Sequence, residues 1–306
     1  MFLRQFKYLL AVVDEGHFGR AADRCFVTQP SLSSGIKQLE IELGVPIFLR
    51  GRGRRFHGLT PEGKRIADWA RQILAQCGAM KEEVSRMQGN LKGRLRLGAM
   101  PSMSPVLPHI LKLLRQKYPS VVVDLQFIGN ESVKVGLAQF SLDAAFIYVD
   151  SAELDDEECL PLYSERLSLL VPDSDQFRNL TEITWEEVAE LPLALLRTSL
   201  HERTFIDQTF EGVDCRPYPK VESESILHLM FQVQFGELST IIPSHFRHMP
   251  GLSAGTKALD LVQPEVKRQV ALVWQGGDID LPMANAIVSI VRELDKSGEL
   301  RHMIGE

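Results

Sequence analysis

Four arginines, Arg50, Arg52, Arg54 and Arg55, fall within six consecutive positions of the first third of the chain, with glycines between them. A guanidinium group donates paired hydrogen bonds to phosphate oxygens, and the glycines suit a β-ribbon that lies along a nucleic-acid backbone. An arginine-rich loop exposed to solvent is the alternative interpretation. Because the arginines follow a helix-turn-helix pattern and no acidic residue stands among them, we favour a nucleic-acid contact.

A polar helix face just before these arginines has the side chains to read DNA. Thr28 is a predicted N-cap for a helix that ends near Gly44, and its core positions recur at steps of four and three residues: Leu32, Ile36, Leu39 and Leu43. The remaining surface carries small or hydrogen-bonding residues: Gln29, Pro30, Ser31, Ser33, Ser34, Lys37 and Gln38. Such side chains near a helix N-terminus can approach base edges and phosphates, although a merely solvated face has the same composition.

Three further helices are predicted around this face. The first extends from Phe2 to Gly16, and a short second helix covers residues 20–25. Thr60 and Pro61 begin a long helix as N-cap and first residue. Apolar residues repeat along that helix in a heptad pattern: Ile66, Ala70, Ile73, Cys77, Met80, Val84 and Met87. The pattern favours a two-helix dimer interface, and packing against the helix's own domain is the alternative.

The rest of the chain alternates between strand and helix patterns, which indicates an α/β domain with a mainly parallel sheet. Strands are predicted at residues 95–99, 121–127, 142–147, 167–171, 193–196, 239–242 and 270–274. Helices are predicted at residues 105–117, 131–140, 201–210, 224–235 and 283–294, and the acidic stretch 155–158 is predicted to be a loop. Two α/β subdomains around one cleft would account for this arrangement.

The charge distribution separates the same two parts. Residues 1–94 hold 16 Lys and Arg against 9 Asp and Glu, whereas the remainder holds 18 against 31, so a net charge of +7 is followed by one of −13. A basic module joined to an acidic domain fits an anion-binding function at the N-terminal end. The apolar runs are too short to span a membrane and no signal peptide is recognised, so we expect a cytoplasmic protein.

Enzyme and metal signals are weak. The Gly251–Gly255 segment matches a hydrolase G-x-S-x-G motif but lacks the flanking strand and helix, and residues 58–64 resemble a phosphate loop without its Ser or Thr. His245 and His248 are interpreted as surface histidines, and the four cysteines are too scattered for a metal site or a close disulfide pair. We expect no enzyme activity, cofactor or metal. A solute-binding protein, the other rival, would not need the basic N-terminal part.

The N-terminal residues resemble the signature of LysR-type transcriptional regulators. The resemblance is carried by Phe6, Gly16-His17-Phe18, Ala21-Ala22, Gln29-Pro30-Ser31-Leu32-Ser33, Ile36, Leu39-Glu40, Leu43-Gly44, Phe48, Arg50, Leu59-Thr60 and Gly63. It implies a winged helix-turn-helix domain at 1–60, a dimerising linker helix at 61–88, a hinge at 89–94 and an effector domain resembling periplasmic binding proteins at 95–306. Subdomain I would comprise about 95–163 and 268–306, and subdomain II about 164–267.

The same resemblance implies partners and site residues. The chain would bind double-stranded promoter DNA as a homo-oligomer, commonly a dimer of dimers, and contact with RNA polymerase is compatible with that role. The implied DNA-binding residues are Gln29, Pro30, Ser31, Ser33, Ser34, Lys37, Arg50, Arg52, Arg54 and Arg55. The implied effector-binding residues are Ser102, Asn130, Thr198 and Ser199. Because these four lie beside predicted helix N-termini with no carboxylate among them, we expect a small anionic effector.

Overall fold

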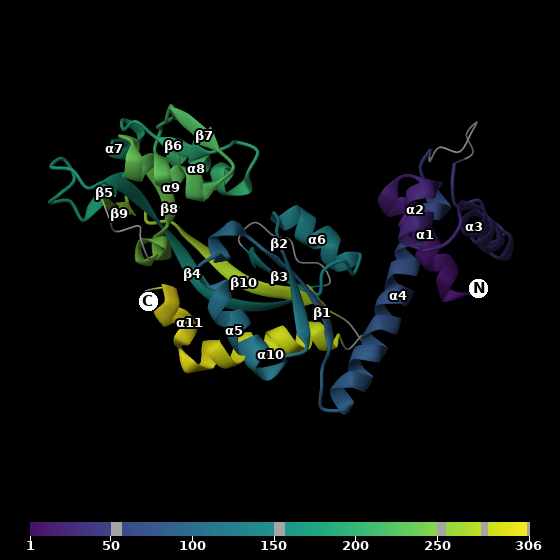
Figure 1. Cartoon of the computed structure of the whole chain (residues 1–306). Helices are drawn as coiled ribbons and strands as arrows, with labels where there is room; N and C mark the ends of the chain where they lie inside the picture. The colour runs from purple at the N-terminus through teal and green to yellow at the C-terminus, as the bar shows by residue number, and fades with distance from the viewer. Residues whose placement is uncertain (50–56, 150–156, 250–254, 277–280, 305–306) are drawn as a thin grey trace.

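The structure, a computed structural model, describes residues 1–49, 57–149, 157–249, 255–276 and 281–304. Figure 1 shows a small helical N-terminal part, one long helix leading away from it, and a larger α/β part with two halves. The predicted order, a helical N-terminal part followed by a long helix and an α/β part with two halves, is confirmed. No helix in the described part of the chain is long and apolar enough to cross a membrane.

Three helices form the N-terminal part: α1 (Leu3–Glu15), α2 (Phe18–Arg24) and α3 (Gln29–Leu43). The residues that immediately precede α2 and α3 cap the first turns of these helices with their side chains. The Nδ1 atom of His17 accepts from the Gly19 amide at 3.0 Å, and Thr28 Oγ1 accepts from the Ser31 amide at 3.4 Å. Leu32, Ile36 and Leu39 are buried as predicted, but Leu43 is exposed at the end of α3, so its assignment to the core was wrong.

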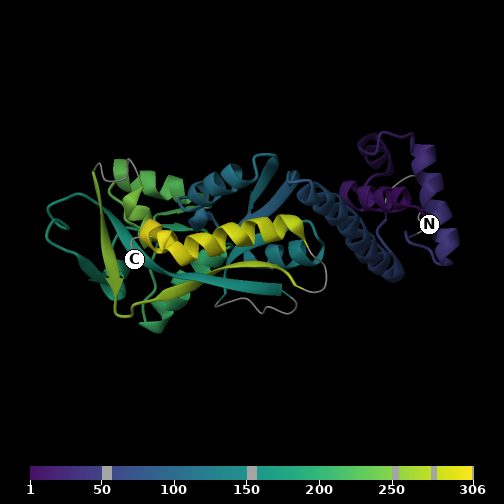
Figure 2. The same cartoon turned by 90° about the horizontal axis from the view of Figure 1, so that it is seen from below.

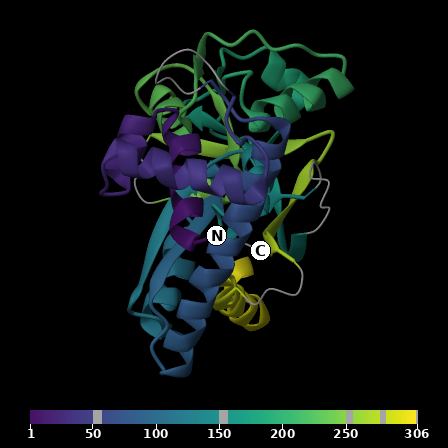
Figure 3. The ribbon, with the colours of Figure 1, turned by 90° about the vertical axis from the view of Figure 1, so that its right-hand side faces the viewer.

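Helix α4 (Pro61–Met87) begins at Thr60, whose Oγ1 accepts from the Gly63 amide at 2.8 Å. Figure 3 shows α4 running away from the three N-terminal helices. Its first half packs against α1, where Ala70 is fully buried with Phe6 and Leu9. The residues of the predicted heptad pattern therefore lie in two different environments. Ile66, Ala70 and Ile73 pack within the N-terminal part, whereas Met80, Val84 and Met87 are exposed.

A mixed eight-stranded sheet organises the effector domain. Its strands are β1 (Gly93–Ala99), β2 (Val121–Phe127), β3 (Ala144–Tyr148), β4 (Glu157–Pro172), β5 (Glu182–Thr184), β8 (Thr240–Pro243), β9 (Thr256–Val262) and β10 (Lys267–Gln275). They follow the order β2-β1-β3-β10-β4-β9-β5, with β8 also paired to β4. Strands β6 (Ala194–Leu196) and β7 (Val221–Ser223) form a separate parallel pair.

Strand β4 joins the two halves of this domain. Over residues 157–166 it pairs with β10, and over residues 167–172 it pairs with β8 and β9. All of these pairings are antiparallel, and so is that of β10 with β3. The prediction of a mainly parallel sheet was therefore wrong. Residues 157 and 158 of the predicted acidic loop belong to β4.

Helices cover both halves. They are α5 (Leu107–Lys117), α6 (Asn130–Ala138), α7 (Trp185–Ala189), α8 (His201–Gly212), α9 (Ile226–Phe235), α10 (Pro282–Ser297) and α11 (Glu299–Ile304), with short 3₁₀ helices η1 (Pro101–Met103) and η2 (Ser244–His248). Figure 2 shows α10 lying across the sheet of the first half. The first half is held by Leu95, Phe146 and Ile287 among other fully or nearly fully buried residues, and the second by Leu169, Trp185 and Phe210.

Candidate functional site

The predicted DNA-reading face lies on the outside of the N-terminal part. Pro30, Ser31, Ser34 and Lys37 of α3 are exposed, and Gln29 and Ser33 are partly exposed. The first turn of the helix is held by its cap, because the Thr28 and Ser31 hydroxyl oxygens also lie 2.9 Å apart. The exposed face of α3 thus presents serine hydroxyls and a lysine ammonium group to solvent, which suits contact with base edges and phosphates. The role of each residue stays a prediction.

The arginines predicted to contact phosphates, Arg50, Arg52, Arg54 and Arg55, lie outside the described residues. The two chain segments that flank them are described. They meet in an antiparallel bridge between Phe48 and Leu59, supported by a hydrogen bond of 3.0 Å from the Leu49 amide to the Gly58 carbonyl. The described residues on either side of the arginine segment are therefore paired with each other just before α4 begins.

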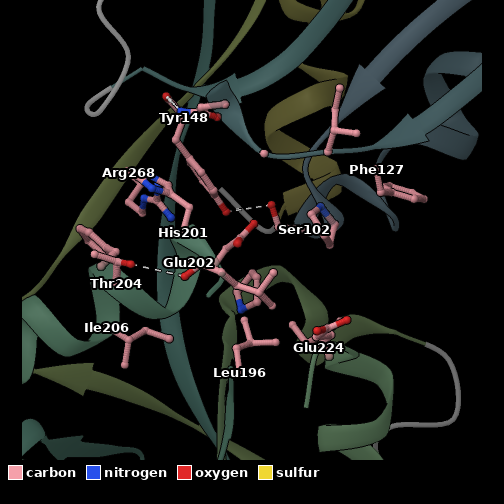
Figure 4. Close-up of a pocket in the computed structure, with 18 of the residues that line it drawn as sticks. Ser102, Phe127, Tyr148, Leu196, His201, Glu202, Thr204, Ile206, Glu224 and Arg268 are labelled. Carbon is pink, nitrogen blue, oxygen red and sulfur yellow. Dashed lines mark hydrogen bonds between the residues drawn. The ribbon is translucent and has the colours of Figure 1, made fainter. Parts of the chain in front are cut away.

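A pocket of about 530 Å³ lies between the two halves of the effector domain. Its walls come from η1, β2–α6, β3, β4, β6, α8, α9, β8 and β10, so residues far apart in the chain meet there (Figure 4). The volume is typical of small-molecule sites. The apolar part of the lining includes Phe127, Ile128, Leu167, Leu196, Leu200, Phe205, Ile206, Ile226 and Ile241.

A buried polar cluster forms part of the pocket wall. The Ser102 hydroxyl lies 2.8 Å from the Tyr148 hydroxyl, and Tyr148 in turn donates to Oε1 of Glu165. His245 lies behind them, with Nε2 2.9 Å from the Ser102 carbonyl oxygen and Nδ1 3.9 Å from Glu165 Oε2. All four residues are at most 4% exposed. The cluster links η1, β3, β4 and η2 across both halves.

Burial sets the protonation of this cluster. It raises the pKa of the Glu165 carboxyl from 4.5 to about 7, although the Tyr148 hydrogen bond and the Arg268 charge act in the opposite direction. The pKa of Tyr148 is raised well above its ordinary value by burial and the neighbouring carboxylate. Burial lowers the pKa of His245, against a smaller effect of its hydrogen bond to Ser102. Near pH 7 Tyr148 and His245 are thus neutral, and Glu165 is poised between its two forms.

Arg268 brings a cation to the same wall. It stands directly opposite Glu165 in the antiparallel pairing of β10 with β4. Its guanidinium carbon lies 3.4 Å from the centre of the Tyr148 ring and 4.6 Å from that of Phe205. A guanidinium at these distances is attracted to aromatic rings, which helps to keep this 3% exposed charge in place.

Three of the four predicted effector residues line the pocket: Ser102, Asn130 and Ser199. Ser102 lies in η1 rather than before a long helix, because α5 begins only at Leu107. Asn130 opens α6 and donates from Nδ2 to the Tyr148 carbonyl at 2.8 Å. Thr198 is exposed and is not among the lining residues, so the structure does not place it at the pocket.

The lining of the pocket does not favour the predicted anionic effector, whose charge stays a prediction. Four carboxylates line the pocket, Glu131, Glu165, Glu202 and Glu224, against one arginine, Arg268. Of these, Glu224 accepts from Arg197 at 3.2 Å. The polar groups that the sequence pattern selected are real pocket residues, but acidic groups surround them.

Sequence reasoning also missed the centre of the site. His245 was interpreted as a surface histidine and is instead buried against Ser102 and Glu165, so that interpretation was wrong. Tyr148, Glu165 and Arg268 were not singled out at all. Their one sequence signal is a polar or charged residue within or at the end of an apolar strand segment, as at Glu165 before Leu167–Val171.

No group of three or more His, Cys, Asp or Glu side chains in the described ranges is arranged to hold a metal ion. The serine of the G-x-S-x-G match, Ser253, lies outside those ranges. His248 ends η2. The expectation that the protein needs no metal or cofactor stays a prediction.

Comparison with known proteins assigns the family. Residues 3–64 match the profile of the bacterial regulatory helix-turn-helix proteins of the lysR family, and residues 88–296 match that of the LysR substrate binding domain. The chain belongs to the LysR family of transcriptional regulators, as the N-terminal signature predicted.

Relatives cover almost the whole chain. The DNA-binding transcriptional dual regulator OxyR of Escherichia coli is 29% identical over 281 residues, which is 90% of each chain. A probable RuBisCO transcriptional regulator of Nostoc is 32% identical over 72% of this chain and 66% of its own. Among solved structures, full-length OxyR of Pseudomonas aeruginosa carrying a cysteine-to-aspartate change is 28% identical, with a TM-score of 0.74 over 96% of this chain and 94% of its own.

Proposed function

We propose that this regulator binds promoter DNA through the exposed face of α3 and that a small molecule in the pocket between the effector-domain halves controls its activity. The observation that carries the proposal is the pocket itself, because residues from both halves, such as Ser102 and Ser199, line one space. A molecule bound there contacts both halves at once. It can therefore favour one relative arrangement of the halves over another.

For DNA, the proposal assigns base contacts to Gln29, Ser31, Ser33 and Ser34 and backbone contacts to Lys37. Pro30 would lie against the DNA groove that α3 enters. Arg50, Arg52, Arg54 and Arg55 would contact phosphates. The excess of seven positive charges in residues 1–94 supports this division of roles. The protein would act in the cytoplasm, where chromosomal DNA and RNA polymerase are found, as a regulator and not as an enzyme.

For assembly, we infer pairing through the exposed second half of α4. Met80 and Met87 are 62% and 77% exposed in the single chain, with Val84 between them at helical spacing. Apolar side chains exposed in a row along a helix are typical of surfaces that meet another helix. A homodimer, with further association into a dimer of dimers, would cover them.

Thiol oxidation is the second candidate mode of control, because several relatives are named hydrogen peroxide-inducible genes activators. The four cysteines, Cys25, Cys77, Cys159 and Cys215, are free thiols, and none lines the pocket. Burial raises the pKa of Cys25 and of Cys159, which disfavours the reactive thiolate at neutral pH. A ligand in the pocket is therefore the better-supported mode.

A reporter fused to the DNA upstream of the gene tests the proposal. Ser199→Trp would place a large side chain in the pocket, whereas Thr198→Trp places the same side chain on the surface beside it. We expect wild type and Thr198→Trp to change reporter expression between growth media, and Ser199→Trp to hold one level while still protecting the same DNA in a footprint. Equal responses of all three proteins would refute control through the pocket, and a response to peroxide alone would support the thiol mode.

A further inference from the structure

We propose that the pocket recognises a small molecule carrying a protonated amine, which is received by the carboxylates of Glu165 and Glu202. This inference rests on the proposed function, since it names the class of effector that the pocket takes. It replaces the expectation of a simple anion. Three features carry it: an unsatisfied buried oxygen, the acidic surroundings, and an apolar lining.

The unsatisfied oxygen is Oε2 of Glu165. The Glu165 side chain is 1% exposed, its Oε1 accepts from Tyr148, and Oε2 has no hydrogen-bond partner among the residues that the structure describes. A buried polar atom left without a partner carries a free-energy cost that a suitable donor removes. Because Glu165 lines the pocket, a ligand can supply that donor.

The neighbouring His245 does not supply it. Its Nε2 lies 2.9 Å from the Ser102 carbonyl oxygen, which only accepts, so the ring carries its proton on Nε2. In the neutral ring, Nδ1 is then an acceptor, and this is the atom that faces Glu165 Oε2 at 3.9 Å. Two acceptors facing each other leave the position next to Oε2 open to a donor from the pocket side.

The surroundings favour a positively charged donor over a neutral one. Arg268, opposite Glu165 on β10, offsets one carboxylate, and Arg197 pairs with Glu224 at 3.2 Å. Glu202, in the first turn of α8, is near enough to Glu165 to influence its ionisation. Figure 4 shows Glu202, Tyr148 and Arg268 around the same space. An ammonium group between Glu165 and Glu202 would donate charge-assisted hydrogen bonds to both carboxylates.

The remaining lining defines the body of the ligand. Leu196, Ile206 and Ile241 present apolar surface within the pocket, and Phe127 lies on its β2 side. A space of about 530 Å³ admits a molecule larger than a bare ammonium ion. The pocket thus fits an amine on an aliphatic chain, and the hydroxyl of Ser199, which lines the pocket, can bind a second polar group.

A matched set of five-carbon compounds tests the class of ligand on the full-length protein. The probes are 1,5-diaminopentane, 5-aminopentanoate, 1,5-pentanediol and glutarate, which share a chain and differ in their end groups, with lysine and arginine as larger amines. Thermal unfolding finds the binders, and calorimetry measures their dissociation constants. We expect amines to raise the melting temperature, whereas pentanediol and glutarate leave it unchanged.

Variants connect the binding to the carboxylates. Glu165→Gln and the partly exposed Glu202→Gln should each weaken amine binding about tenfold or more, since each removes a charge-assisted contact. Glu190→Gln, an exposed residue at the end of α7, should leave it unchanged. A cooperative urea unfolding transition, followed by the fluorescence of the buried Trp185 and Trp274, verifies that the effector domain of each variant is folded.

The proposal fails if no amine stabilises the wild type more than pentanediol does, if glutarate binds at least as tightly as the amines, or if both carboxylate variants keep wild-type affinity. These outcomes differ from failure of the proposed function. If glutarate binds and changes promoter binding, the pocket is a regulatory site for another class of molecule. If reporter expression with Ser199→Trp changes between growth media as it does with wild type, regulation through the pocket is itself refuted.

Discussion

Replacing Glu165 by glutamine should change how the stability of the effector domain depends on pH. In the folded protein the pKa of this carboxyl is about 7, against 4.5 for an unperturbed glutamate. The folded state therefore holds its proton more tightly than the unfolded state does. The proton stabilises the fold fully below about pH 4.5, and that stabilisation is lost as the pH rises through about 7.

The size of the effect follows from the shift. Each pKa unit corresponds to about 1.4 kcal/mol, so the whole shift corresponds to about 3 kcal/mol, most of which falls between pH 5 and pH 8. Glutamine keeps an oxygen that can accept from Tyr148 but cannot ionise. The unfolding free energy of Glu165→Gln minus that of wild type should thus rise by roughly 2 to 3 kcal/mol from pH 5 to pH 8.

Urea unfolding followed by tryptophan fluorescence measures this difference, because Trp185 and Trp274 are buried in the two halves of the domain. Other titrating groups are shared by the two proteins, so their contributions cancel in the difference. Glu190→Gln, whose carboxyl is exposed, is the matched control and should give a flat difference. If the Glu165→Gln difference is also flat, the carboxyl is ionised throughout this pH range and the argument from its burial is wrong.

Two further predictions concern DNA and assembly. Lys37→Ala should weaken binding to target and unrelated DNA alike, and the slope of log binding constant against log salt concentration should become smaller by about one. Gln29→Ala should instead reduce the preference for the target by about 1 to 3 kcal/mol. Fluorescence anisotropy over a salt series measures both effects, and equal losses for both variants on both DNAs would contradict this division of roles. Because Val84 is exposed in the single chain, Val84→Glu should leave the N-terminal fold intact and give assemblies of lower mass in light scattering. Ala70 is fully buried beside α1, so Ala70→Glu should instead unfold the N-terminal part. Retention of the wild-type mass by Val84→Glu would exclude pairing through this end of α4.

The sequence was most informative where the signals are local. The caps at Thr28 and Thr60 and the periodic burial of Leu32, Ile36 and Leu39 are consequences of neighbouring residues, and the structure has them where the sequence placed them. Strand direction is not a local property. Alternating apolar patterns look alike in either direction, so the antiparallel β4 and β10 could not be distinguished from parallel strands.

The centre of the pocket could not be predicted for the same reason. His245 and Arg268 lie 80 and 103 positions after Glu165 in the chain, and they meet it only through the position of η2 and the register of β4 with β10. Ser102 and Asn130 were found because they follow strands whose ends meet at one edge. Thr198 shows the limit of that rule, since its neighbour Ser199 lines the pocket and Thr198 does not.

The partner exchange along β4 has a mechanical consequence. A strand of 16 residues is about 50 Å long, and its hydrogen-bonded partner changes from β10 to β8 and β9 immediately after residue 166, next to Glu165. On the neighbouring path, only residues 263–266 separate β9 from β10. Because both connections between the halves are short, the halves cannot rotate freely about a flexible linker. A change in the angle between the halves therefore requires twisting of the hydrogen-bonded pairing of β4 with β10, at the position where Glu165 and Arg268 stand opposite each other.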